Sequence, residues 1–303
     1  MLSKKIYEKI NTLIETKDIV LNANMAKYCT LKLGGNVTAL VNVSDEKQII
    51  HAISIAKEFG LPYHIIGNGS NIFVYPEKYN AVIIKISKNM ANISIEGDIL
   101  IVQGGTSLAL LSQKAMEFGL SGLEFAVGIP GTIGGAVYMN AGAYGSEIKD
   151  VLIRANTISE NGDVFVRTNE ELDFKYRYSK LQNNNEIVIS ASFKLEKGDS
   201  NAIKALGDGY KAKRIATQPI GIPSCGSTFK RPINNIAAKL IDECGLKGYR
   251  IGGCSVSKKH AGFLVNDNNG TADDYYKLIM DVRNIVLQKT GIYLDTEVQI
   301  LGG

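Results

Sequence analysis

A nearly uncharged, glycine-rich stretch between Gly119 and Gly145 most constrains how this chain can fold. It reads GLSGLEFAVGIPGTIGGAVYMNAGAYG and carries one charged residue, Glu124. A flexible solvated linker would contain more Ser, Asp and Lys, and a regular helix would be weakened by this many glycines. Because glycine permits positive φ and lets the backbone approach a ligand closely, the stretch predicts buried backbone that lines a ligand site. A compact cluster of turns without a ligand is the alternative interpretation.

Length and composition exclude several classes of protein. The chain has 303 residues, 45% hydrophobic and 21% charged, which is ordinary for globular proteins and unlike disordered, collagen-like or coiled-coil chains. Lys and Arg (34) barely exceed Asp and Glu (30) and are dispersed. We therefore expect no nucleic-acid partner, and since no apolar run has transmembrane length, no membrane insertion.

The cysteines and histidines give no indication of a metal site. The four cysteines contain no C-x-x-C pair, and the three histidines are far apart in the sequence. We expect no metal and reduced thiols, as in a cytoplasmic protein. A monomer is the expected state, although the sequence leaves the oligomeric state open.

The order of predicted elements indicates an α+β fold. Apolar spacing predicts an N-terminal helix and then a strand-helix-strand unit from Thr38 to Ile66, with Ser44 as the helix N-cap. A further helix is predicted from Ser107 to Phe118 with Thr106 as its cap. The prolines of TQPIGIP indicate a boundary near residues 205–220. Other predicted strands cover residues 72–75, 81–86, 99–103, 151–158, 164–168, 186–196, 249–256, 262–265 and 292–301, and other helices cover 202–215, 236–244 and 272–289.

A short polar loop, Gly67-Asn68-Gly69-Ser70-Asn71, lies between two predicted strands. A dinucleotide-binding fingerprint would need a third glycine where Ile72 stands, followed by a helix, and a Walker lysine is also missing. A phosphate bound here would be held by successive backbone N–H groups in a nest between strands.

Three polar side chains lie in patterns that allow either a catalytic or an ordinary surface role. Arg177 lies in FKYRYS, where strand geometry would put Lys175, Arg177 and Ser179 on one face. Glu297 shares a face of the predicted last strand with Asp295 and Gln299. Solvated strand faces explain both patterns equally well.

The third candidate, Ser227, lies between Pro223 and Pro232. Gly226-Ser227-Thr228 is typical of a turn with local side-chain hydrogen bonds. The neighbouring Cys225 is the easier acid, with an ordinary pKa of about 8.5.

Five segments in order resemble the UDP-N-acetylenolpyruvoylglucosamine reductase (MurB) family over nearly the whole chain: IIGNGSNIFV, GLEFAVGIPGTIGGAVYMNAGAYG, DFKYRYS, PSCGSTFKRP and DTEVQILG. The resemblance implies an FAD-binding region of the vanillyl-alcohol-oxidase type at residues 1–205, with subdomains of about 1–80 and 81–205. A smaller α+β substrate-binding domain would follow at 206–303. The implied reaction is NADPH-dependent, FAD-mediated reduction of UDP-N-acetylglucosamine enolpyruvate to UDP-N-acetylmuramate.

The resemblance also implies residue roles. Its Y-R-x-S pattern selects Arg177 to stabilise an enolate-like intermediate. Its glycine-serine pair selects Ser227 as the proton donor. Its terminal strand selects Glu297 as a partner that helps to organise the enolate or the proton supply. Without a histidine or cysteine in the two glycine-containing loops, we expect FAD to be bound non-covalently. The implied cofactor-binding residues are Gly67, Asn68, Gly69, Ser70, Asn71, Gly128, Pro130, Gly131, Thr132, Gly134, Gly135, Asn140, Gly142 and Ala143.

The UDP diphosphate requires cations, for which Lys213, Arg214, Lys230 and Arg231 are candidates. The chain lacks the tyrosine-bearing loop of the longer family branch, so the residue that shields the substrate is open. An FAD-dependent oxidase of the same fold, acting on another sugar or alcohol, is the nearest alternative function. A catalytically silent nucleotide-binding module is a second alternative.

Overall fold

The computed structural model describes residues 2–303. By packing, the chain divides into two compact units. The first comprises residues up to Leu21, Ala39–Asn68 and Ala81–Lys213, and the second comprises Asn22–Thr38, Gly69–Asn80 and Arg214–Gly303. Helices and strands are mixed within both, so the α+β prediction is confirmed. The division into an FAD-binding region that ends at residue 205 and a substrate-binding domain that begins at residue 206 stays a prediction.

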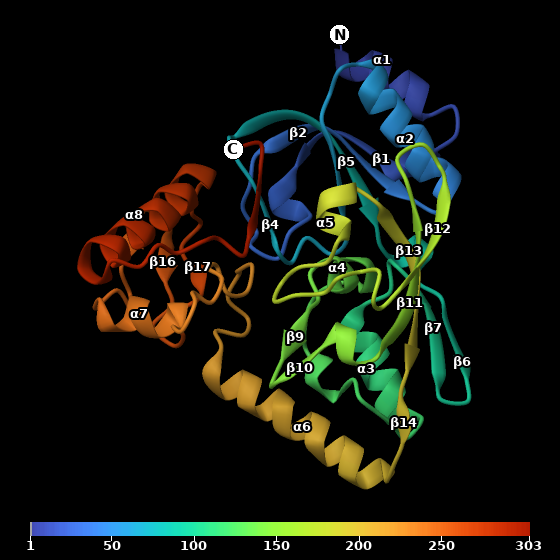
Figure 1. Cartoon of the computed structure of the whole chain (residues 1–303). Coiled ribbons are helices and arrows are strands. Elements are labelled where there is room, and N and C mark those ends of the chain that lie inside the picture. Colours follow the sequence, from blue (N-terminus) through green and yellow to red (C-terminus); the bar gives the residue numbers. More distant parts are fainter. Residues whose placement is uncertain (1) are drawn as a thin grey trace. The chain divides into compact units, whose positions relative to one another are not determined.

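Two helices cover a four-stranded sheet whose strand order is β1-β2-β5-β3 (Figure 1). Their apolar faces join the strands in one core: Ile6 and Ile10 on α1, and Ile49 and Ile53 on α2, are fully buried. Strand β3 is parallel to β5, with Ile66 opposite Lys85. The elements are α1 (Leu2–Ile10), β1 (Ile19–Asn24), β2 (Asn36–Val43), α2 (Glu46–Glu58), β3 (Tyr63–Ile66) and β5 (Lys78–Ile86).

A five-stranded antiparallel sheet of order β12-β11-β13-β7-β6 forms the rest of the first unit's framework. Helices α3 and α4 share a core with it around Leu100, Leu111, Ile133 and Phe193. The strands are β6 (Ile93–Glu96), β7 (Ile99–Gln103), β11 (Leu152–Ile158), β12 (Val164–Thr168) and β13 (Ile187–Lys194), and the helices are α3 (Leu108–Glu117) and α4 (Ile133–Tyr138). Shorter elements are β8 (Leu120–Ser121), β9 (Gly142–Ala143), β10 (Ser146–Glu147), α5 (Leu181–Asn184) and β14 (Glu196–Lys197), after which α6 (Ser200–Thr217) begins.

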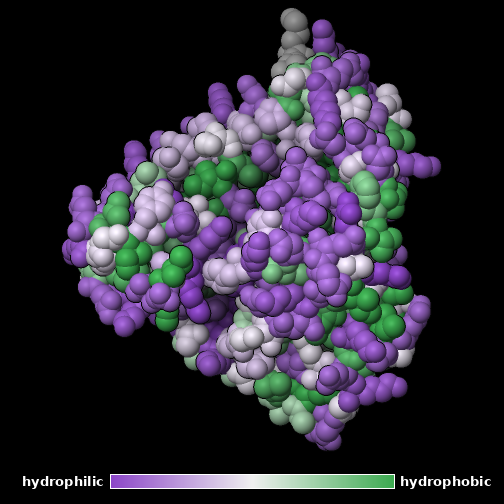
Figure 2. All heavy atoms as spheres, in the orientation of Figure 1, coloured by the Kyte–Doolittle hydropathy of each residue, from purple (hydrophilic) through white to green (hydrophobic). Residues whose placement is uncertain are grey.

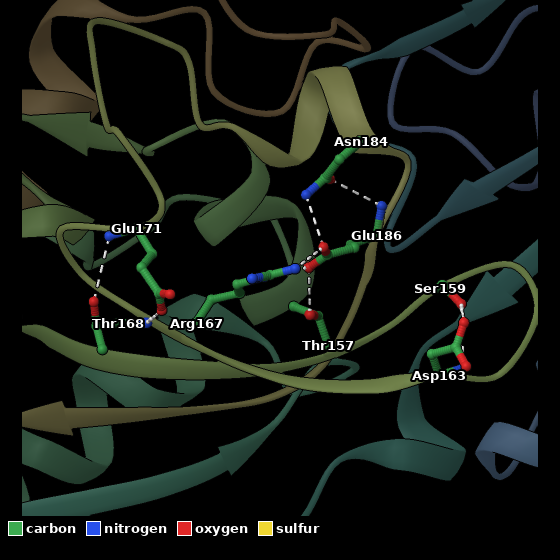
Figure 3. A network of polar contacts seen from close by, with 8 residues as sticks. All are labelled: Thr157, Ser159, Asp163, Arg167, Thr168, Glu171, Asn184 and Glu186. Carbon is green, nitrogen blue, oxygen red and sulfur yellow. Dashed lines mark hydrogen bonds and ion pairs between the residues drawn. The ribbon is translucent and has the colours of Figure 1, made fainter.

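A buried carboxylate links the strands of this sheet (Figure 3). Glu186 Oε2 accepts hydrogen bonds from Thr157 Oγ1 at 2.6 Å and from Arg167 Nε at 3.0 Å. Its Oε1 accepts from Arg167 Nη2 at 2.5 Å and from Asn184 Nδ2 at 2.8 Å. The Glu186 charge is therefore compensated by a bidentate guanidinium, as a buried charge requires.

The second unit is built around α8 and its neighbours (Figure 1). A capping box formed by Thr271 and Asp274 begins this helix, and Gly291 at φ +74° ends it. Fully buried Tyr275 packs edge-on against Phe73, with ring centroids 5.1 Å apart. The elements are β4 (Ile72–Val74), α7 (Ala237–Glu243), β15 (Arg250–Ile251), β16 (Cys254–Val256), β17 (Leu264–Asn266), α8 (Ala272–Thr290) and β18 (Gln299–Leu301).

Several local predictions are wrong in instructive ways. The N-caps of α2 and α3 are Asp45 and Ser107, one residue after the predicted Ser44 and Thr106. In each pair both side chains are able to cap the helix, and the cap is the residue whose backbone is extended just before the first helical turn. The glycine-rich stretch includes a short α-helix, α4, and a 3-10 turn at Glu124–Ala126, where no helix is predicted.

The last strand is shorter than predicted, since regular pairing covers only Gln299–Leu301. Upstream of it, Leu294 and Val298 are buried and Asp295 is exposed, but Thr296 and Glu297 are both partly exposed, so burial does not alternate as in a regular strand. This part of the chain makes one bridge, between Phe229 and Thr296, and then bends at Glu297 and Val298.

Hydrophilic side chains cover most of the face seen in Figure 2, between smaller hydrophobic groups. Among residues 2–303, no helix is long and apolar enough to span a membrane. Within the same residues, no group of three or more His, Cys, Asp or Glu side chains is arranged to hold a metal ion.

Candidate active site

The first half of the 67–71 loop packs against the glycine-rich stretch. A Cβ on Gly67 would lie 2.1 Å from Thr132 Oγ1, so the close approach requires glycine. Asn68 Nδ2 donates a hydrogen bond to Pro130 O at 3.1 Å. The structure thus brings together two groups of predicted cofactor-binding residues that are more than sixty positions apart in sequence.

The second half of the loop is held by residues of the second unit. Gly69 has φ +64°, and a Cβ there would lie 2.2 Å from Tyr28 O. Gly69 O accepts from Thr30 N at 3.0 Å. Asn71 Nδ2 donates to Glu297 O at 3.0 Å, while Asn71 O accepts from Gln299 N at 2.9 Å. Asn71, predicted to bind cofactor, therefore anchors the segment that carries Glu297.

Backbone groups of the glycine-rich stretch are largely engaged within the protein. Gly131 O accepts from Leu108 N at 3.0 Å, and Gly134 N donates to Gly104 O at 2.8 Å. Thr132 caps α4 by accepting from Gly135 N at 3.4 Å. Gly128 has φ +82° in the turn before it. These glycines shape a surface mainly by lacking side chains.

Arg177 lies on a tight turn, so the predicted strand over 174–179 is wrong. Lys175 and Tyr178 exchange two backbone hydrogen bonds of 3.1 Å, and Tyr176 and Arg177 form the tip between them. Arg177 has φ +53°, a left-handed conformation that is uncommon for a side chain of this size. A positive φ at the second central residue alone is the pattern of a type II turn, and it aims the guanidinium differently from a strand.

The guanidinium is fixed by its surroundings. Arg177 Nη2 donates to Gly142 O at 3.1 Å, and Arg177 Cζ lies 4.9 Å from the centre of the Tyr176 ring. Gln182 Nε2 also stabilises the turn by donating a hydrogen bond to Arg177 O at 3.1 Å. The contact unites predicted catalytic Arg177 with predicted cofactor-binding Gly142.

Asn140, another predicted cofactor-binding residue, is fully buried and holds this turn. Its Nδ2 donates to Lys175 O at 3.1 Å and to Glu147 Oε2 at 2.9 Å. Its Oδ1 accepts from Lys149 N at 3.1 Å. The side chain therefore serves the architecture around Arg177, which the sequence pattern does not reveal.

Ser227 and Glu297 lie on neighbouring segments of the second unit, whereas Arg177 belongs to the first. Glu297 N donates to Thr228 O at 2.8 Å, and Lys230 N donates to Asp295 O at 2.8 Å. Gly226, at φ +76°, forms the turn before Ser227. Both candidate side chains are partly exposed, as a residue that meets a substrate must be.

Cys225 is a poor alternative acid in this environment. Its side chain is buried, and Sγ donates to Ile72 O at 3.1 Å. Burial raises the pKa of the Cys225 thiol well above its ordinary value, because the thiolate would lose its hydration.

The predicted substrate cations lie in different places. Lys213 lies over Tyr144, with Nζ 5.6 Å from the ring centre, and Tyr144 stacks on Tyr210 at 4.4 Å between centroids. Arg231 is exposed and Lys230 is partly exposed beyond Ser227. Arg214 is the first residue of the last segment of the second unit, Arg214–Gly303. Nothing in these contacts singles out a diphosphate site.

Family models match both parts of the chain. One, described as UDP-N-acetylenolpyruvoylglucosamine reductase, C-terminal domain, matches residues 218–301. Another, described as FAD binding domain, matches residues 37–167.

Similar proteins span the whole chain. A UDP-N-acetylenolpyruvoylglucosamine reductase of Clostridium botulinum is 42% identical over 96% of this chain and 97% of its own length. One of Caldanaerobacter subterraneus is 38% identical over 99% of both. The crystal structure of UDP-N-acetylenolpyruvylglucosamine reductase from Thermus caldophilus superposes with a TM-score of 0.79 at 33% identity, covering 93% of this chain and 97% of that one.

Proposed function

The chain belongs to the UDP-N-acetylenolpyruvoylglucosamine reductase family, and we propose from that premise how its residues divide the work of the reaction. It is an FAD-dependent oxidoreductase that reduces the enolpyruvyl group of UDP-N-acetylglucosamine enolpyruvate to give UDP-N-acetylmuramate, with NADPH as hydride donor. Its product belongs to peptidoglycan precursor synthesis. The observation that carries the assignment is near-complete coverage of both chains at about 40% identity.

The glycines of the 67–71 loop and of the glycine-rich stretch fit a dinucleotide cofactor. A Cβ on Gly67 or Gly69 would collide with neighbouring protein atoms, so glycine at both positions allows the loop backbone to pack closely against the protein and take its shape. Successive backbone N–H groups in such a loop can hold phosphate oxygens. FAD, when bound, supplies the hydride that reduces the alkene.

Arg177 stabilises the negative charge that develops when hydride reaches one alkene carbon. That charge delocalises onto the substrate carboxylate, and a planar guanidinium matches a carboxylate with two parallel donors. The contacts of Arg177 with Gly142 and Tyr176 support this role, since they hold the guanidinium before substrate arrives.

Ser227 delivers the proton to the other alkene carbon, and Glu297 organises that transfer. The shared backbone pairing of their segments, through Thr228 O, supports treating the two residues as one catalytic group. The raised pKa of the buried Cys225 thiol favours Ser227 over its neighbour. Nearby Lys230 and Arg231 offer positive charge that favours loss of the hydroxyl proton.

The proposal also covers the cations that bind the substrate, the compartment in which the protein acts and its oligomeric state. Lys213, Arg214, Lys230 and Arg231 remain the proposed groups for the UDP diphosphate. The cysteines are free thiols, which supports a reducing cytoplasm as the site of action. A monomer remains the proposed state.

An anaerobic titration tests the function. NADPH should bleach the flavin band of the purified protein, and UDP-N-acetylglucosamine enolpyruvate should restore it. Bleaching without restoration would favour the oxidase alternative. A protein that takes up no FAD would overturn the flavoenzyme assignment.

A further inference from the structure

Strand β5 carries a lysine within an apolar run. Lys85 lies between Ile84, which is fully buried, and Ile86, which is 5% exposed, and it is itself partly buried. It lies opposite Ile66, the last residue of β3. The next residue along the chain is Gly67, the first residue of the 67–71 loop.

The ammonium of Lys85 contacts that loop directly. Nζ donates a hydrogen bond to Gly67 O at 2.5 Å. The Thr132 side chain also packs closely against Gly67. The beginning of the loop is therefore held between a cation and the turn that leads into α4.

Within the described residues, 2–303, no carboxylate forms an ion pair with Lys85. Burial lowers its pKa, and no carboxylate in residues 2–303 acts in the opposite direction. A partly buried cation without an opposite charge costs stability, because the protein replaces its hydration incompletely. Such a cost is typical of a group retained for a ligand.

We propose that Lys85 binds and positions the FAD diphosphate by placing positive charge at the start of the loop. This inference rests on the proposed FAD binding. The diphosphate is the anion whose chemistry matches an uncompensated ammonium beside a backbone nest.

The stability of the flavin-free protein distinguishes this proposal from a purely structural role of Lys85. If Lys85 only fastened the loop through Gly67 O, replacing it would destabilise the protein without flavin. If its charge awaits an anion, Lys85→Met should leave the flavin-free protein equally stable or more stable, because an unpaired buried charge is removed.

The test uses deflavinated full-length protein and two measurements, the thermal midpoint without FAD and the FAD dissociation constant. Lys85→Met should retain or raise the midpoint and weaken FAD binding by about 10- to 100-fold, the range for a hydrogen bond to a charged group. Lys85→Gln, which keeps a donor without the charge, should weaken binding similarly, whereas Lys85→Arg should largely restore it. Lys78→Met, at an exposed position of β5, is the control and should match wild type in both measurements.

Several outcomes would overturn the inference. Unchanged FAD affinity in Lys85→Met would do so, and so would full rescue by Lys85→Gln, which would show that the hydrogen bond and not the charge matters. A lowered midpoint with unchanged affinity would establish the structural role. If wild-type protein itself bound no FAD, the proposed function would fail instead.

Discussion

The side-chain amide of Asn71 donates a 3.0 Å hydrogen bond to the backbone carbonyl of Glu297, across 226 positions of sequence. The first residue ends a loop predicted to bind the cofactor, and the second carries a predicted catalytic carboxylate. This contact joins the 67–71 loop to the segment that carries Glu297, within the second unit. Substitutions at Asn71 and Glu297 can separate the effect of this hydrogen bond on turnover from its effect on FAD binding.

We expect Glu297→Gln to lower kcat by about 100-fold or more, because an amide cannot accept or relay a proton as a carboxylate does. Asp295→Asn is the matched control on the same segment, with an exposed side chain, and it should retain activity within about threefold. Steady-state kinetics at saturating substrate measures both. Equal losses in the two variants would refute the choice of Glu297.

Asn71→Ala should lower turnover by about 5- to 10-fold, the effect of losing one hydrogen bond of roughly 1 kcal/mol that positions Glu297. In a Glu297→Gln background the same change should have little further effect, because a positioning residue acts only through its partner. FAD affinity should change less than turnover. Additive losses with weakened FAD binding would instead support a direct contact of Asn71 with cofactor.

Ser227→Ala should abolish restoration of the flavin band by the sugar nucleotide while leaving bleaching by NADPH intact, since only the second half-reaction needs a proton on carbon. Rapid-mixing absorbance under anaerobic conditions separates the two steps. Cys225→Ala should keep both half-reactions, and its cost should be confined to stability, at about 1–2 kcal/mol. Loss of the second step in Cys225→Ala alone would reverse the assignment.

Arg177→Lys should lower kcat by at least about 100-fold with little loss of stability. Lysine keeps the positive charge but loses the planar fork that matches a carboxylate and the hydrogen bond to Gly142 O. Lys175→Met on the same turn is the control, because this ammonium is paired with Asp173 at an exposed site. A wild-type kcat in Arg177→Lys would show that charge alone suffices.

The Arg167–Glu186 pair should make stability depend on pH in a defined direction. Burial by itself would raise the pKa of the Glu186 carboxyl, but hydrogen bonds and charge from Arg167, with Thr157, outweigh it and lower the pKa. The stabilisation is therefore full above the unfolded pKa of about 4.3 and is lost as pH falls through the lower folded value. We expect Glu186→Gln to cost about 2 kcal/mol at pH 7 and progressively less below about pH 4, by urea unfolding.

Glu15→Gln supplies the control for that experiment. The Glu15–Lys17 pair is a surface pair with side chains 72% and 73% exposed, so its loss should leave the stability essentially unchanged at either pH. A difference between Glu186→Gln and wild type that grew as pH fell would contradict the assigned sign.

Local sequence determined most elements of this fold. The strand Tyr63–Ile66 and the strand Ile99–Gln103 have their predicted bounds, because short runs rich in β-branched and aromatic residues between turn-forming residues favour a strand locally. Ordered motifs also determined the family, which is confirmed over the whole chain.

Tertiary structure decided what local patterns could not. The residues around Arg177 alternate like a strand, yet Asn140 and Gln182 bind the backbone there as a turn, with Arg177 at φ +53°. Lys85 lies within the predicted strand 81–86, and only its parallel pairing with Ile66 brings its ammonium to Gly67 O. The reason is physical: local propensities act over a few residues, whereas hydrogen bonds such as Asn71–Glu297 form only after distant segments have packed.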